Sequence, residues 1–372
     1  MANSTKSYLV LGLMSGSSLD GLDIAFAKFD FYKKDISWEL LKAETLSFSS
    51  SWKSILQELP GYDSKALLRV NSDFGHYSAE LVNTFLEKHN VSPDFIAAHG
   101  HTVFHFPEDG FTTQIGDGAA LAVGTGLPVI CDFRTHDIAL GGQGAPLAPV
   151  ADSILFPGFD FYLNLGGIAN ITFIDKGEVT AFDICPANQV LNHLSEEVGL
   201  EFDARGGIAR EGKNIPALRK KIDGIPYFSK PYPKTLDNNW IREQVFPIFD
   251  TQKGKTKDKL NTACWHIAEE ISKAITELMK EKNSEALRKV LITGGGAFND
   301  YLIECIKSSC QQMRSTEIIL PSPDIIAFKE ALLMALLGAL RIENRPNSIS
   351  SATGAQFDSI GGAIYQGTKK HI

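Results

Sequence analysis

The segment SYLVLGLMSGSSLDGLDIAFAKF, residues 7–29, is the stretch that decides the fold class. Its two apolar runs, 7–14 and 22–29, predict strands that are joined by the small-residue loop 15–21. A loop this short favours an antiparallel hairpin, because a parallel crossover needs about a dozen residues or more. Residues 161–183 repeat the order of strand, glycine-rich turn and strand, which suggests an internal repeat.

Length and composition limit the classes of protein that this chain can be. Its 372 residues suggest two domains at roughly 150 residues each, and its 44% hydrophobic content is enough to build cores. Lys and Arg number 36 against 44 Asp and Glu, and the net charge of −8 argues against nucleic acid as the main partner. Five Cys without a C-x-x-C pair fit neither a disulfide framework nor a thiolate zinc site. We expect a reducing, cytoplasmic compartment.

The remaining patterns predict further elements and a boundary. No run reaches 18 uninterrupted apolar residues, and 325–340, which Lys329 and Glu330 break, predicts a buried helix. Helices are also expected at 51–59 and 65–88. The apolar pattern stops near 141–144, a candidate domain boundary, and the polar stretch 215–259 predicts a loop-rich excursion.

Residues 12–23 have the composition of a phosphate cradle. Glycines let backbone N–H groups approach an anion, and the serines add hydroxyl donors. Asp20 and Asp23 could hold a hydrated Mg²⁺ beside it. A polar hairpin turn explains the same composition. The glycine spacing matches neither a Walker A loop nor a Rossmann fingerprint.

Two more glycine turns follow apolar strands, Gly166-Gly167 and Gly294-Gly295-Gly296. Bare backbone lets a phosphate or a flat ligand lie close to the chain, although a tight turn explains either segment alone. Three such loops in one chain, drawn from both halves, favour a nucleotide held between two domains.

Several polar residues near the ends of strands could carry chemistry. Asp183 ends an apolar strand just before a predicted helix, so it is either a general base or a helix N-cap. His99, His101 and His105 share a face of an extended segment, which fits substrate hydrogen bonding or packing better than a metal site. Arg134 could clamp a carboxylate or a phosphate, or form a surface ion pair with Asp132 or Asp137.

Together these motifs resemble one family, the 1,6-anhydro-N-acetylmuramic acid kinases, within the superfamily of sugar kinases, actin and heat-shock ATPase chaperones. The departures are small: the family usually has Thr at Ser17, Gln at His101, and Gly at Cys185 and Ala187. The shared segments, in chain order, are SGSSLDGLD (15–23), HGHTVFH (99–105), QIGDGAALA (114–122), DFR (132–134), GGQGAPLAP (141–149), NLGGIANIT (164–172), FDICPAN (182–188), DARGGIAR (203–210), KPYPKTLDN (230–238), LITGGGAFND (291–300) and KEALLMALLGAL (329–340).

The resemblance implies an α/β fold with two ribonuclease H-like (actin-like ATPase) domains, mixed sheets flanked by helices, and a cleft between the domains. The first domain would be 1–140 plus about 345–372, and the second 141–344. Asp183 would be the catalytic residue, with Arg134, His99 and Asn188 binding the sugar and Mg²⁺ at Asp20 and Asp23, directly or through water. The residues implied for ATP are Gly16, Ser17, Ser18, Leu19, Asp20, Gly21, Leu22, Asp23, Gly166, Gly167, Gly294, Gly295 and Gly296.

The activity implied by the resemblance is that of an ATP-dependent kinase of cell-wall sugar recycling. It would open the 1,6-anhydro ring of anhydro-N-acetylmuramic acid with water and phosphorylate O6, giving N-acetylmuramic acid 6-phosphate and ADP. The expected partner is a small sugar rather than nucleic acid or a membrane, and a homodimer is left open. The alternatives are a kinase for a neutral anhydrosugar such as levoglucosan and a non-catalytic, actin-like nucleotide switch. A glycosidase would need a second carboxylate to pair with Asp183.

Overall fold

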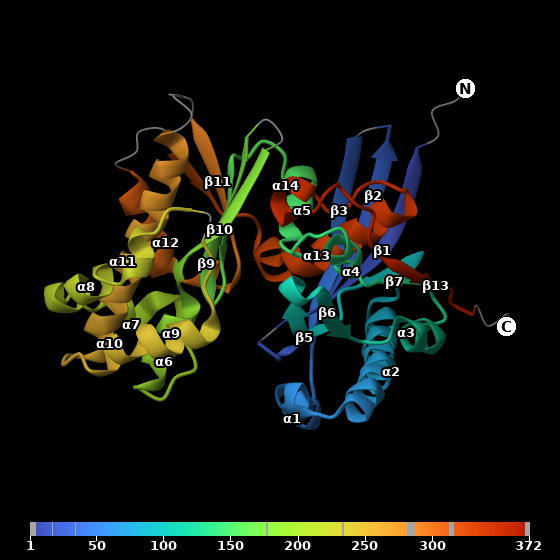
Figure 1. The fold of residues 1–372 in the computed structure, drawn as a ribbon, viewed down its shortest axis with the longest axis horizontal. Helices are drawn as coiled ribbons and strands as arrows, with labels where there is room; N and C mark the ends of the chain where they lie inside the picture. The colour runs from blue at the N-terminus through green and yellow to red at the C-terminus, as the bar shows by residue number, and fades with distance from the viewer. Residues whose placement is uncertain are drawn as a thin grey trace. The chain divides into compact units, whose positions relative to one another are not determined.

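The computed structural model describes residues 5–16, 18–33, 35–175, 178–232, 234–280, 287–311 and 316–368. The chain divides into two compact units: unit 1 is Met1–Pro157 with Phe328–Ile372, and unit 2 is Gly158–Ala327. Each unit contains a mixed sheet with helices packed on it, which confirms the expected α/β class (Figure 1). The expected domain limits, 1–140 with about 345–372 and 141–344, stay a prediction.

The sheet of unit 1 combines an antiparallel meander with parallel strands. The hairpin expected from residues 7–29 is present, since β1 and β2 pair antiparallel from Lys6↔Phe31 to Ser15↔Leu22. β4 and β7 continue the sheet parallel to β1, and β13 closes its edge antiparallel. In spatial order the strands are β13 (Ala363–Tyr365), β7 (Val129–Cys131), β4 (Phe95–Ala98), β1 (Lys6–Ser15), β2 (Gly21–Tyr32) and β3 (Asp35–Ser47).

Helices pack against the sheet of unit 1 and bury the apolar side chains of β1. Leu11 and Leu13 enter a core that includes Phe74 of the long helix α2. At Gly12, a Cβ would lie 1.9 Å from the carbonyl oxygen of Ala331 on α13, so this close helix–strand packing requires glycine. The helices are α1 (Ser50–Glu58), α2 (Ser64–His89), α3 (Gly118–Thr125), α4 (Thr135–Ala139), α5 (Ala148–Leu155), α13 (Pro323–Ile342) and α14 (Ser350–Thr353), and a separate hairpin joins β5 (His101–Phe106) to β6 (Phe111–Ile115).

Unit 2 repeats this scheme. Its first three strands form an antiparallel meander, and β11 runs parallel to both β8 and β12. The order β10-β9-β8-β11-β12 therefore corresponds to β3-β2-β1-β4-β7 of unit 1, which confirms the repeat suggested by the sequence. The strands are β8 (Phe161–Leu165), β9 (Ile168–Asp175), β10 (Glu178–Pro186), β11 (Arg288–Thr293) and β12 (Thr316–Ile319).

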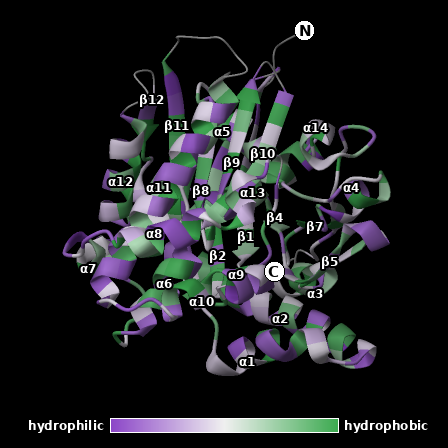
Figure 2. Ribbon diagram, turned by 60° about the vertical axis from the view of Figure 1, so that its left-hand side comes forward, coloured by the Kyte–Doolittle hydropathy of each residue, from purple (hydrophilic) through white to green (hydrophobic). Residues whose placement is uncertain are grey.

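The long helix α11 carries much of the core of unit 2. Figure 2 shows both hydrophilic and hydrophobic residues along this helix. The hydrophobic ones recur every three or four residues, and its buried side includes Cys264, Ile267, Ile271 and Ile275. The helices of the unit are α6 (Asn188–Glu196), α7 (Gly207–Arg210), α8 (Pro216–Asp223), α9 (Asn238–Gln244), α10 (Phe246–Asp250), α11 (Thr256–Lys280) and α12 (Asp300–Cys310).

Residues 215–259 differ from the loop-rich excursion expected there, because they contain α8, α9 and α10. These helices are short, and each anchors few apolar residues in the core: Leu218, Ile222, Ile241 and Phe249. Their polar exposed sides hide the helical period in the sequence. No helix in the described ranges has both the length and the hydropathy needed to span a membrane.

Candidate active site

Unit 1 carries an open hollow at the end of β1. The space inside it, open solvent at its mouth included, is about 760 Å³. Four distant sequence motifs meet there, so residues implied for ATP lie beside residues implied for the sugar. The residues that line this unit 1 hollow are Met14, Ser15, Gly16, Leu19, His99, His101, Thr102, Arg134 and Glu330.

The guanidinium of Arg134 is held from two sides. Its Nε donates to His99 Nε2 at 2.9 Å, and its Nη1 donates to the carbonyl oxygen of Gly144 at 2.7 Å. It forms no ion pair with Asp132 or Asp137, the surface alternative considered from the sequence. Burial lowers the pKa of Arg134 to about 10, so the side chain remains charged near neutral pH.

The three histidines of residues 99–105 lie in different surroundings. His99 and His101 are buried, whereas His105 is exposed and pairs with Thr112 Oγ1 at 3.0 Å. His101 Nδ1 lies 3.1 Å from Ser15 Oγ, and burial lowers the pKa of His101. Within the part of the chain that the structure describes, these rings do not form a group at metal-ligand distances.

The loop before β2 separates into residues that face the unit 1 hollow and residues that support the fold. Gly16 and Leu19 line the hollow, and Leu19 has a positive φ of 58°. Gly21 packs closely against β3, since a Cβ on Gly21 would lie 2.4 Å from the carbonyl oxygen of Leu46. Leu22 is buried in the core. Ser18 and Asp20 are exposed, and Ser17 lies outside the described residues.

Carboxylates gather near this loop. Asp23 accepts a hydrogen bond from Thr45 Oγ1 at 2.5 Å, and its pKa is raised by burial and by the charges of Glu330 and Asp20. Repulsion among carboxylates favours a bound cation, and carboxylate oxygens are the ligands that Mg²⁺ prefers. A cation at Asp20 and Asp23 would relieve this repulsion, and the magnesium position expected there stays a prediction.

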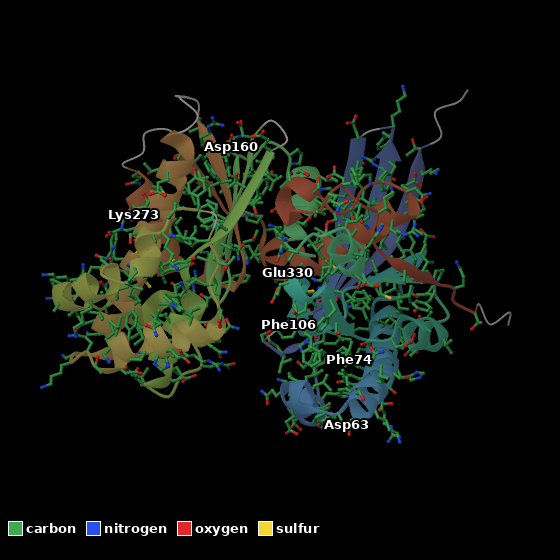
Figure 3. The ribbon with its side chains drawn as sticks, viewed as in Figure 1. Asp63, Phe74, Phe106, Asp160, Lys273 and Glu330 are labelled. Atoms are coloured by element: carbon green, nitrogen blue, oxygen red, sulfur yellow. The ribbon has the colours of Figure 1, made fainter. Side chains whose placement is uncertain are left out.

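Glu330 is the residue of the unit 1 hollow that the sequence reasoning missed. Glu330 belongs to α13, where Figure 3 labels it. Its side chain lines the hollow and reaches solvent, yet burial of its carboxylate raises its pKa. The charge of Arg134 acts in the opposite direction on that pKa. The available signal was a pair of charged residues, Lys329 and Glu330, inside a mostly apolar helix.

In unit 2 the two glycine turns and Asn188 come together at the ends of the parallel strands β8 and β11. Asn188 Nδ2 donates to the carbonyl oxygen of Leu165 at 3.1 Å. Gly294 has a φ of 84°, and a Cβ there would lie 2.5 Å from Asn164 Oδ1. A Cβ at Gly296 would lie 3.0 Å from Asn188 Oδ1, so both glycines are needed for this close packing.

The Gly166-Gly167 turn is tied to the start of α6. The carbonyl oxygen of Gly166 accepts from Asn188 N at 3.1 Å, and that of Gly167 accepts from Ala187 N at 2.8 Å. Gly295, by contrast, is exposed, and a Cβ there would make only an ordinary van der Waals contact, 3.7 Å from Asn188 Nδ2. The Gly294–Gly296 turn therefore offers bare backbone to a ligand at Gly295.

Asp183 lies in β10 beside a bulge, with its backbone and one carboxylate oxygen anchored. Oδ2 accepts from Leu236 N at 2.9 Å, the backbone N–H donates to Lys234 O at 2.9 Å, and the carbonyl oxygen accepts from Tyr227 OH at 2.6 Å. Among the described residues Oδ1 has no hydrogen-bond donor, and the side chain is partly exposed. Burial raises the pKa of Asp183, which is the change expected for a proton acceptor.

The alternative role of Asp183 as a helix cap does not match the structure. The N-cap position of α6 is Ala187, and Asp183 lies earlier in the chain, within the strand. Its carboxylate is therefore oriented by a backbone N–H from residue 236 rather than by the helix.

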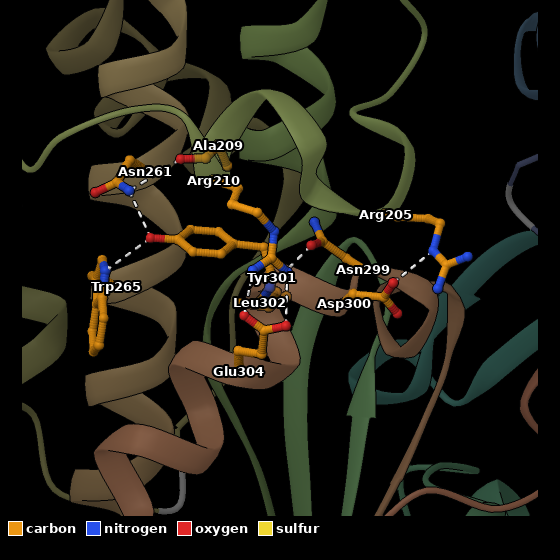
Figure 4. Close-up of polar contacts among 10 residues, drawn as sticks. All are labelled: Arg205, Ala209, Arg210, Asn261, Trp265, Asn299, Asp300, Tyr301, Leu302 and Glu304. Carbon is orange, nitrogen blue, oxygen red and sulfur yellow. Dashed lines mark hydrogen bonds and ion pairs between the residues drawn. The ribbon is translucent and has the colours of Figure 1, made fainter.

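The motif at 203–210 is bonded to α12, the helix that follows the Gly294–Gly296 turn (Figure 4). Arg205 pairs with Asp300 at 2.6 Å, and Arg210 forms a two-pronged ion pair with Glu304 at 2.6 and 2.7 Å. Asn299 caps α12 directly after the turn. These contacts give the motif a structural role next to the glycines.

Comparisons with known proteins agree along almost the whole chain. A family model described as anhydro-N-acetylmuramic acid kinase matches residues 8–367. A protein of that name from Hydrogenovibrio crunogenus is 32% identical over 98% of this chain and 99% of its own length. Another from Shewanella amazonensis is 33% identical over 96% and 98%. Among solved structures, an activator of 2-hydroxyisocaproyl-CoA dehydratase from Clostridium difficile is similar with a TM-score of 0.39 and 13% identity, over 92% of this chain and 97% of that one.

Proposed function

This chain belongs to the anhydro-N-acetylmuramic acid kinase family, and we propose that it opens the 1,6-anhydro bridge of anhydro-N-acetylmuramic acid with water and phosphorylates O6 with ATP. The products are N-acetylmuramic acid 6-phosphate and ADP. The observation that carries the proposal is Asp183, a carboxylate with one oxygen held by Leu236 N, the other without a donor among the described residues, and a raised pKa.

In the proposed mechanism Asp183 acts as the general base. It takes a proton from a water molecule whose oxygen attacks C1 of the sugar, and the bond between C1 and O6 breaks. The electron pair left on O6 attacks the γ-phosphorus of ATP, and ADP leaves. Asp183 then returns its proton to solvent. A positioned base of this kind contributes roughly 10²–10⁴-fold to the rate.

Each unit, taken by itself, offers bare backbone to which phosphate oxygens of ATP could bond. Gly16 and Leu19 in unit 1, and Gly167 and Gly295 in unit 2, are our candidates for backbone N–H contacts. Mg²⁺ would be held by Asp20 and Asp23, and when bound it supplies charge stabilisation at the phosphates. Burial first, and then the charges of Glu330 and Asp20, raise the pKa of Asp23, and a bound cation would offset both effects.

The unit 1 hollow is our candidate for the sugar. The charged side chain of Arg134 suits a substrate that carries a carboxylate, which is the reason for preferring the muramic acid over a neutral anhydrosugar. Asn188, implied for the sugar, bonds Leu165 O instead, so we assign it to positioning the glycine turns. We place the reaction in the cytoplasm, where ATP is available.

The test is product analysis in isotopic water. The protein is incubated with ATP, Mg²⁺, anhydro-N-acetylmuramic acid and ¹⁸O-water, and the product is identified by mass. The proposal expects a sugar that has gained one phosphoryl group and one water, with the ¹⁸O at C1. Phosphorylation without addition of water, or ATP hydrolysis that does not depend on sugar, would contradict it; the second result would favour the nucleotide switch.

A further inference from the structure

His99 has both ring nitrogens engaged within the protein. Arginine can only donate, so His99 Nε2, at 2.9 Å from Arg134 Nε, is an acceptor. The ring proton then lies on Nδ1, which donates to the carbonyl oxygen of Gly100 at 2.9 Å. The residue is only 6% exposed. Neither nitrogen is therefore left to bond a sugar hydroxyl, although His99 lines the unit 1 hollow.

The uncharged state of His99 follows from its surroundings. Among the described residues, the ionisable groups that act on the pKa of His99 are Arg134, His101 and His105, and none of these carries a negative charge. Burial, followed by the charge of Arg134, lowers the pKa of His99 to about 3. The ring is therefore a permanent acceptor for Arg134 at every pH at which the protein would work.

Arg134 keeps unused donors. Its Nε and one N–H of Nη1 are bonded, which leaves one N–H of Nη1 and both of Nη2 without a partner among the described residues. Glu330 lies in the same hollow but makes no hydrogen bond to them in these ranges. Neighbouring N–H groups of a guanidinium match the two oxygens of a carboxylate.

The second anchor of Arg134 is also rigid. Gly144, whose carbonyl accepts from Arg134, donates its N–H to Asp137 Oδ2 at 2.8 Å. Asp137 is 1% exposed, and its Oδ1 accepts from Ser348 Oγ at 2.7 Å and Thr353 Oγ1 at 2.8 Å. The guanidinium is thus fixed between a buried ring and a loop that is held by a buried carboxylate.

We propose that His99 is a positioning residue that fixes Arg134 for the lactyl carboxylate of the substrate, and that this pair sets the preference for an acidic over a neutral anhydrosugar. The inference rests on the proposed function, because it takes the muramic acid carboxylate as the ligand of Arg134. It replaces the substrate contact implied for His99 by a contact within the protein.

Two histidine variants separate positioning from packing. In His99→Gln the side-chain oxygen can replace Nε2 as the acceptor for Arg134. In His99→Asn the shorter side chain can still bond Gly100 O but does not reach Arg134. The ligand pair is anhydro-N-acetylmuramic acid and 1,6-anhydro-N-acetylglucosamine, which lacks only the lactyl ether. Calorimetric titrations without ATP, and steady-state kinetics with it, give the preference between the two sugars.

We expect His99→Asn to raise the Kd and KM for the acidic sugar about tenfold, equivalent to about 1.4 kcal/mol, and to leave the neutral sugar unaffected. Its kcat should remain within about threefold of the wild-type value, because binding rather than chemistry is changed. His99→Gln should restore most of the preference, and Arg134→Ala should abolish it. Melting temperature and ATP binding are measured for each variant.

Three results would overturn the inference. One is His99→Asn with wild-type preference while Arg134→Ala has lost it, which would mean that His99 does not fix the guanidinium. Another is an unchanged preference in Arg134→Ala, which would place the carboxylate elsewhere. If His99→Asn does not fold, Arg134→Lys keeps the charge without the Nε donor, and wild-type preference in that variant would also overturn it. Failure of the proposed function is distinguishable, because wild-type protein would then form no phosphorylated sugar even though the binding preference persists.

Discussion

Replacing Asp183 by Asn tests the proposed chemistry with little change in structure. The amide has nearly the same shape, and its oxygen can still accept from Leu236 N, now 2.9 Å from Asp183 Oδ2. What is lost is the ability to take a proton. Removing a general base costs roughly 10²–10⁴-fold in rate, which is about 2.7–5.4 kcal/mol of barrier at 1.36 kcal/mol per tenfold. We expect turnover to fall by that factor.

The stability of Asp183→Asn should move differently from its activity. Because burial raises the pKa of Asp183 above its unfolded value, the ionised side chain destabilises the folded state at pH values above that unfolded pKa. A neutral amide removes this cost, so the variant should melt at the same temperature as wild type or higher at pH 7.

The assay couples ADP release to a colour reaction, and ATP binding is measured by calorimetry. Asp250→Asn is the matched control in the same unit, since Asp250 is exposed and bonds only His193 among the described residues; it should retain near wild-type turnover. Turnover by Asp183→Asn within about threefold of wild type would refute the assignment, because a general base is worth at least about a hundredfold. Loss of ATP binding together with a lower melting temperature would instead indicate a structural role.

Three further results are expected. Gly294→Ala should lower the free energy of unfolding by about 1–3 kcal/mol and weaken ATP binding, because of its positive φ and a Cβ 2.5 Å from Asn164 Oδ1; Gly207→Ala, where nothing lies within 4 Å of an added Cβ, is the control. Asp137→Asn should lower the free energy of unfolding by about 1.5–3 kcal/mol, since a buried charged acceptor of three hydrogen bonds is lost, and a melting temperature equal to wild type would contradict this. The acid limb of kcat/KM should lie above the usual Asp pKa of about 3.9, because burial raises the pKa of Asp183 and the base works only when ionised; full activity down to about that pH would be inconsistent with the assignment.

Local patterns were sufficient for much of the fold. The apolar runs in residues 7–29 predicted the first hairpin, the order of strand, turn and strand in 161–183 predicted its counterpart strands, and the glycine turns marked where strands end. The helices expected at 51–59 and 65–88 are α1, Ser50–Glu58, and α2, Ser64–His89. Such features follow from spacing within one element, which a sequence displays directly.

Contacts between distant residues were not predictable in this way. Arg134 was recognised as a clamp, but its anchor His99 is 35 residues away and could not be distinguished from a sugar ligand. Asp183 was singled out as a base, yet its orientation depends on Leu236, 53 residues downstream in a stretch that had been expected to be loops. In both cases the chemistry of one residue depends on a tertiary partner that composition and period do not specify.

Helix α13 shows why a charge in an apolar helix is informative but ambiguous. Burying a charge is costly unless a partner compensates it, so both Lys329 and Glu330 need a reason to be there. Lys329 has one within the fold, an ion pair with the buried Asp152 at 2.5 Å. Glu330, one residue later and therefore on another side of the helix, opens into the unit 1 hollow near Arg134. The sequence marks both positions equally, and only their tertiary partners show that the first charge stabilises the fold and the second is available to a ligand.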